Sequence, residues 1–180
     1  MDVWQQDAVT AARQLIGYRF YVREADHSLT GGVIAETEAY TSDDAASHSF
    51  RGKTPRNEVM YGEAGRLYVY FTYGMHWCAN IVAGPIGSAE AVLIRTLDPD
   101  KGLANIRKRR LNRPDAELAD GPAKLCQALG ITGRDNGTAI DGKHLVLLAP
   151  KGAPLAVRAT TRIGISKDRE RLWRFIAFND

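Results

Sequence analysis

The chain has 180 residues, 44% of them hydrophobic, which gives enough apolar surface for one domain with a real core. It has no 18-residue apolar run and no N-terminal secretory signal, so we expect a cytoplasmic protein rather than a secreted or membrane-spanning one. The formal net charge is +3, but the charges are unevenly distributed. Residues 1–50 carry 3 basic and 8 acidic groups, whereas residues 101–180 carry 16 basic and 8 acidic groups.

The first third of the chain is predicted to form a helix, a hairpin and a long loop. Apolar periodicity predicts a helix over residues 4–15, and strand patterns follow at 18–23 and 32–40. The segment 41–65 is rich in Ser, Asp, Gly and Arg, and loops of this length in a compact domain are usually functional.

Two acids, Glu36 and Glu38, stand in the second predicted strand. Because side chains on a strand alternate between faces, they are expected on one face with Ile34 and Tyr40, about 6.6 Å apart. That spacing approaches the roughly 6.5–9.5 Å between the carboxyl groups of inverting sugar hydrolases. Such carboxylates face the scissile bond from opposite sides, whereas these two point in parallel. We therefore expect one acid to act alone, with a solvated strand face as the alternative.

An aromatic hairpin is predicted next, with strands at residues 67–72 and 75–82. Tyr68 and Tyr70 share one face of the first strand. Tyr73 precedes a glycine at the predicted tip, where a bulky ring has little core in which to be buried. Side chains at such tips can wedge into a nucleic acid.

The rest of the chain mixes strands and helices. A strand is predicted over residues 91–97, and helical patterns follow from Pro99 to Arg110 and from Pro122 to Gly130. Three returning strands are predicted at 144–148, 155–165 and 171–178.

A basic cluster, Arg107–Arg110 with Arg113, lies in this part of the chain. It could bind a polyanion. However, Asp115, Glu117 and Asp120 lie nearby and favour a solvated helix face on which the charges pair with one another.

No metal or nucleotide cofactor is expected. The histidines and cysteines show no paired metal-ligand spacing, and the glycines form neither a dinucleotide fingerprint nor a phosphate-binding lysine motif. The two cysteines stand in apolar contexts typical of small buried side chains, without a disulfide. These residues are His27, His48, His76, His144, Cys78 and Cys126.

Several short blocks occur together in one order along the chain, and on them it resembles the alkyladenine (3-methyladenine) DNA glycosylase family of the alkylpurine-DNA N-glycosylase type. The blocks are Glu36-Thr37-Glu38-Ala39-Tyr40, Ala46-Ser47-His48-Ser49, Thr54-Pro55-Arg56-Asn57, Leu67-Tyr68-Val69-Tyr70 through Tyr73-Gly74-Met75 to Asn80, Val92-Leu93-Ile94-Arg95, and Gly121-Pro122-Ala123-Lys124-Leu125-Cys126. The likeness is specific and is weaker before Gly31 and after Gly142. It implies a single α+β domain over residues 1–180, with a curved, mainly antiparallel sheet flanked by helices, similar to the C-terminal domain of formyltransferases.

The resemblance also implies a site. Glu38 would position and deprotonate the hydrolytic water, and Arg95 would help to hold that water and a nearby phosphate. Tyr40 and His48 would lie on one side of a flipped base and Tyr70 on the other.

Two more roles follow from the same likeness. Tyr73 would fill the gap that the flipped base leaves in the duplex. Asn80 would exclude guanine by crowding its exocyclic amine.

The activity implied is that of a base-excision-repair enzyme. It would flip an alkylated or deaminated purine of the 3-methyladenine, 7-methylguanine and hypoxanthine class out of double-stranded DNA. It would hydrolyse the N-glycosidic bond and leave an abasic site, without lyase activity. The expected protein is a monomer without cofactor or membrane association.

Two other functions remain open at this point. A non-catalytic nucleic-acid-binding module of the same fold would use the same aromatic rings and basic surface. A carbohydrate hydrolase would use Glu36 and Glu38. Glu38 argues against the binding module, because binding alone does not need a buried acid. The wedge at the hairpin tip and the basic C-terminal half argue against the carbohydrate hydrolase.

Overall fold

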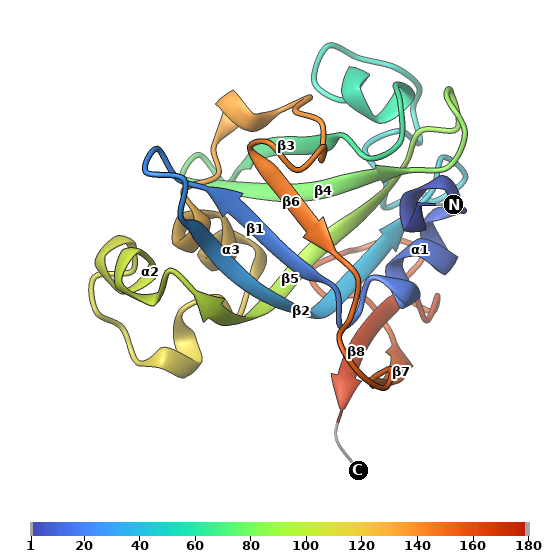
Figure 1. Ribbon diagram of the computed structural model, residues 1–180. Coiled ribbons are helices and arrows are strands. Elements are labelled where there is room, and N and C mark those ends of the chain that lie inside the picture. The colour runs from blue at the N-terminus through green and yellow to red at the C-terminus, as the bar shows by residue number, and fades with distance from the viewer. Residues whose placement is uncertain (1, 179–180) are drawn as a thin grey trace.

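Eight strands in residues 2–178, the part of the chain that the computed structural model describes, form one antiparallel sheet (Figure 1). They are β1 (Arg19–Arg23), β2 (Leu29–Tyr40), β3 (Leu67–Thr72), β4 (His76–Ala83), β5 (Glu90–Lys101), β6 (Leu145–Leu148), β7 (Ala156–Thr160) and β8 (Arg174–Phe178). Six of them follow the order β3-β4-β5-β2-β1-β6, while β8 pairs with β2 and β7 pairs with β8. The sheet curls, so that β7 and β8 lie beside the end of β2 (Figure 1).

The α-helices of the described residues are short: α1 (Ala8–Gln14), α2 (Leu103–Arg109) and α3 (Pro122–Leu129). The helix predicted over residues 4–15 is divided, because the Asp7 carboxylate caps the first turn of α1 and a separate 3-10 turn, Val3–Gln5, precedes it. The predicted start and end of α3 are confirmed, with Gly130 in the left-handed conformation at its end. None of the helices described is long and apolar enough to cross a bilayer.

The apolar core lies between the helices and one face of the sheet. Fully buried side chains from α1, α2, α3 and the inner face of the strands belong to one cluster, and they include Leu15, Phe20, Ile34, Ile94, Ile106 and Leu125. The predicted α+β class with a curved antiparallel sheet is therefore confirmed. The cysteines Cys78 and Cys126 are both buried and free, as expected.

A β-bulge in β2 sets which side chains face the core. The pairing with β5 shifts between Ile34 and Glu36, so that Ala35 is an extra residue. As a result Ile34 is in the core, whereas Glu36 and Glu38 lie on the opposite side. The prediction that Ile34 shares a face with these acids is wrong, because the bulge interrupts the alternation that a regular strand would keep.

Two predicted boundaries are also wrong. β5 continues through Pro99 to Lys101, where a helix had been predicted. The strand tolerates this proline because its pairing with β4 ends at Leu93, so no hydrogen bond to β4 is lost with the N–H that Pro99 lacks. The strand predicted over residues 155–165 ends at Thr160. The residues that follow instead form a loop that reaches the end of β2.

The hairpin tip is confirmed. Tyr73 and Gly74 have φ of 52° and 68°, and the N–H of Met75 donates to the Thr72 carbonyl at 3.2 Å. Positive φ at both central residues is characteristic of the tight turn that matches strand twist. Tyr73 is 82% exposed, so its ring projects from the end of β3 and β4 without packing on the core.

Candidate active site

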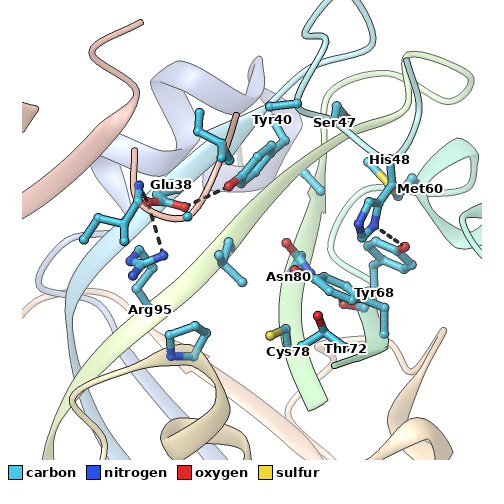
Figure 2. A pocket seen from close by; sticks show the side chains of 18 of the residues that line it. Glu38, Tyr40, Ser47, His48, Met60, Tyr68, Thr72, Cys78, Asn80 and Arg95 are labelled. Atoms are coloured by element: carbon cyan, nitrogen blue, oxygen red, sulfur yellow. Dashed lines mark hydrogen bonds and ion pairs between the residues drawn. The ribbon is translucent and has the colours of Figure 1, made fainter. Parts of the chain in front are cut away.

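A cavity of about 350 Å³ lies beyond the bulge in β2, between the hairpin, the loop 41–65 and the loop after β7. All seven side chains singled out in the sequence line it: Glu38, Tyr40, His48, Tyr70, Tyr73, Asn80 and Arg95. Their elements are far apart in the chain, and the curl of the sheet brings them together. Figure 2 shows Glu38, Tyr40 and Arg95 on one side and His48, Tyr68 and Asn80 on the other.

The Glu38 carboxylate is fully buried and is surrounded by donors. Its Oε1 accepts the backbone N–H of Ile163 at 2.8 Å and lies 3.2 Å from Arg95 Nη1, and its Oε2 accepts the Tyr40 hydroxyl at 2.8 Å (Figure 2). An ionised carboxylate offers about four acceptor positions. These three donors therefore occupy three of the four positions and leave room for one further donor.

Arg95 connects the two acids of β2. Its Nε donates to Glu36 at 2.7 Å, and Glu36 also accepts from Arg174. Burial opposes the charge on Arg95, but Glu38 and Glu36 outweigh it, so the pKa of Arg95 is raised and the guanidinium stays charged. Of the two acids only Glu38 lines the cavity.

The opposite wall is aromatic. The His48 and Tyr70 rings meet edge to face with centroids 4.5 Å apart, and His48 Nδ1 is 2.9 Å from the Tyr68 hydroxyl. Two rings that sandwich a planar base stand about 7 Å apart, at twice the van der Waals contact distance. This packing favours His48 and Tyr70 as one surface of the cavity and Tyr40 as the other, and the sides of a flipped base that these residues would contact stay a prediction. His48 packs with Tyr70, and Tyr40 faces His48 across the cavity (Figure 2).

The polar groups of this wall are neutral at neutral pH. Burial of the ring against its aromatic neighbours, and then the charge of nearby Arg56, lower the pKa of His48 to about 4, although the residue as a whole is exposed and water offsets part of the effect. Burial raises the pKa of Tyr68 to about 12 and raises that of Tyr70 as well. The lowered pKa of His48 argues against this residue as a proton donor for neutral leaving bases.

Asn80 is fixed at the floor of the cavity. It lies in β4 opposite Tyr68 and beside Leu93 of β5, and it is 4% exposed. Its Nδ2 donates to the Tyr68 carbonyl at 3.1 Å, which sets the orientation of the amide.

Sequence reasoning missed the loop after β7, which supplies Arg162 and Ile163 to the site. Arg162 forms a fully buried ion pair with Asp44, and its guanidinium lies 4.7 Å from the centre of the Tyr40 ring. The sequence around Gly164, with one arginine and two isoleucines in a basic segment, was the available sign of this loop. That segment had been predicted to be a strand. Only the three-dimensional fold shows that this arginine meets an acid of the loop 41–65.

The basic cluster of α2 is largely paired within the protein. Arg107 pairs with Asp115 at 2.7 Å, Arg109 pairs with Glu24 at 2.8 Å, and Arg110 donates to the carbonyls of residues 117 and 118. These contacts favour a solvated helix face whose charges pair within the protein over a site that binds a polyanion.

Metal-ligand side chains do not gather in the part of the chain that the structure describes, since no three His, Cys, Asp or Glu residues stand where they could hold an ion.

Comparison with known proteins identifies the family to which these features point. Residues 2–180 match the model of the methylpurine-DNA glycosylase family. A protein of Carboxydothermus hydrogenoformans named "Putative 3-methyladenine DNA glycosylase" is 46% identical over 180 residues, covering 98% of this chain and 93% of its own length. Proteins with the same name from Agrobacterium fabrum and Methanoculleus marisnigri are 46% and 44% identical, covering 96% of this chain and 84% and 91% of their own lengths.

Proposed function

Since this chain belongs to the methylpurine-DNA glycosylase family, a family of DNA repair hydrolases, we propose that it releases alkylated or deaminated purines from duplex DNA. In this proposal the damaged nucleotide is flipped into the cavity, and a water molecule activated by Glu38 cleaves the N-glycosidic bond. The product is an abasic site, and no covalent enzyme intermediate or strand cleavage is involved.

The observation that carries the proposal is a buried carboxylate, held by three donors, that faces an aromatic wall across a cavity. Turning a base out of the duplex costs a few kcal/mol, and stacking it on aromatic rings returns about 1–3 kcal/mol per base. Tyr40 on one side and the paired rings of His48 and Tyr70 on the other supply such surfaces. A purine carrying a positive charge gains further from electron-rich rings.

The same geometry supports a hydrolytic step. As the bond between sugar and base lengthens, positive charge develops on the sugar, and the Glu38 anion stabilises it. Water then adds to the anomeric carbon, its proton passes to Glu38, and the base leaves with the bonding electrons. A ring-alkylated base departs as a neutral molecule, so this step needs no acid, which is consistent with an uncharged His48.

The two rival functions fit the site less well. A module that only binds DNA has no use for a desolvated carboxylate held by three donors, because burying a charge is costly unless it is paired. In a sugar hydrolase built on Glu36 and Glu38 both acids would face the substrate. Glu36 is instead occupied by Arg95 and Arg174 outside the cavity.

The direct test is incubation with duplex DNA that contains one alkylated or deaminated purine, followed by alkali to cut at abasic sites. We expect strand cleavage at the lesion only after alkali treatment. Cleavage before alkali would contradict the absence of lyase activity, and intact strands after alkali would contradict the proposed function.

Asn80 offers a test of lesion selectivity. We expect Asn80→Ser to increase the excision of purines that carry a 2-amino group relative to hypoxanthine, because a smaller side chain removes a clash that acts on one competitor only. The measurement is the ratio of single-turnover rates on the two substrates. An unchanged ratio would place the discrimination at another residue.

A further inference from the structure

The Arg162 guanidinium lies among aromatic side chains beside the cavity. It lies 4.7 Å from the centre of the Tyr40 ring and 5.3 Å from that of the Trp173 ring, and the Arg171 guanidinium lies 4.3 Å from the centre of Trp173. The Arg162 guanidinium thus contacts two aromatic rings, one of which also contacts a second arginine. Such contacts are strongest where the cation is shielded from water, as the fully buried Arg162 side chain is.

Hydrogen bonds fix the same guanidinium to three segments of the chain. Its two terminal nitrogens pair with both oxygens of Asp44, and one also donates to the Ala39 carbonyl at 2.9 Å at the end of β2. The other donates to the Asp168 carbonyl at 3.3 Å. The planar guanidinium of Arg162 thus joins β2, the loop 41–65 and the loop after β7. A lysine has the same charge but could not make these contacts together, because it lacks the planar set of donors.

Two of the three donors to Glu38 depend on this arrangement. Tyr40, whose hydroxyl donates to Oε2, is stacked on Arg162, and Ile163, whose N–H donates to Oε1, is its neighbour in the chain. Only the third donor, Arg95, reaches Glu38 from a different part of the fold.

We propose that Arg162 is a positioning residue for base excision, which aligns the Tyr40 hydroxyl and the Ile163 N–H on the Glu38 carboxylate. This inference rests on the proposed function, since it gives Glu38 the role of activating water. Arg162 does not touch the substrate. It acts through the geometry of the two donors, so its loss affects the chemical step more than DNA binding.

The test compares Arg162→Lys and Arg162→Ala with the parent enzyme in single-turnover excision and in lesion-DNA binding. We expect the alanine variant to lower the excision rate by about tenfold or more, because hydrogen bonds to charged groups contribute about that factor. The binding constant should change less than about twofold, and the lysine variant, which keeps the charge without the fork, should lie between.

Arg109→Ala is the matched control. It removes a partly buried arginine–glutamate pair of α2 outside the cavity, so it should destabilise the fold without lowering the excision rate. Equal excision rates for the Arg109 and Arg162 variants, at temperatures where both are folded, would overturn the inference.

A double-mutant cycle with Tyr40→Phe separates positioning from general loss of stability. If Arg162 acts by aligning the Tyr40 hydroxyl, removing that hydroxyl should slow excision in the parent but have much less effect in Arg162→Lys. Independent effects that simply multiply would overturn the inference. If Arg162→Ala does not fold, the lysine variant and the uncharged pair Arg162→Gln with Asp44→Asn provide the same comparison. A parent enzyme without excision activity would contradict the proposed function itself, and is distinguishable from these results.

Discussion

Replacing Glu38 by Gln is expected to lower the rate of base release by about 100- to 10,000-fold, because positioned proton transfer contributes that much to such reactions. The amide fits the site. Its carbonyl can accept from Ile163 and Arg95 as the carboxylate does, and its NH₂ can donate to the Tyr40 oxygen, whose hydroxyl proton is free to turn away. Lesion-DNA binding and thermal stability should therefore change little, and single-turnover kinetics with a binding titration measure both effects.

Glu36→Gln is the matched control for this variant. It makes the same chemical change two residues away, at an acid held by Arg95 and Arg174 outside the cavity. We expect a much smaller loss of rate, arising from a looser Arg95. Near-normal turnover by Glu38→Gln, or a larger defect in Glu36→Gln, would show that the catalytic acid has been assigned to the wrong residue.

Tyr73→Ala is expected to impair excision from duplex DNA far more than excision of the same lesion from a single strand. In a duplex the flipped base competes with restacking, and a ring in the vacated position opposes its return. If the wedge supplies about 1–2 kcal/mol, its loss lowers the duplex rate about 5- to 30-fold. A single strand has no such gap, so its rate should be nearly unchanged.

The exposed position of Tyr73 makes this a clean experiment, since the ring contributes little to the folded core. Tyr73→Phe keeps the ring and should behave like the parent enzyme. Met75→Ala, in the same turn and 68% exposed, controls for general changes at the tip. Equal losses on duplex and single-stranded substrates would make Tyr73 a residue of the hairpin rather than a wedge.

Much of the site could be predicted because its signals are local. The acids of β2 and the tyrosines of β3 recur at the period of a strand, and a glycine after Tyr73 predicts the turn. Proline and glycine likewise mark the ends of α3. Each of these features is determined by residues that are close together in the sequence, and each is present in the structure.

The remaining features depend on contacts between distant segments. The side of the cavity on which His48 lies is decided by its hydrogen bond to Tyr68 and its packing on Tyr70, which no local pattern encodes. The Arg162–Asp44 pair joins residues that are 118 positions apart. The bulge at Ala35 is a shift in pairing with β5, and a single strand read by alternation carries no sign of it.

That bulge makes β2 intolerant of small changes in length. The strand presents Ile34 to the core on one side of Ala35 and Thr37, which donates to a carbonyl of α1, on the other. Inserting one further residue between Ala35 and Glu36, with Ile34 kept in place, would turn both glutamates toward the apolar core. Because unpaired carboxylates there would be prohibitively costly, relatives of this chain should show substitutions in this strand but no single-residue insertions at this point.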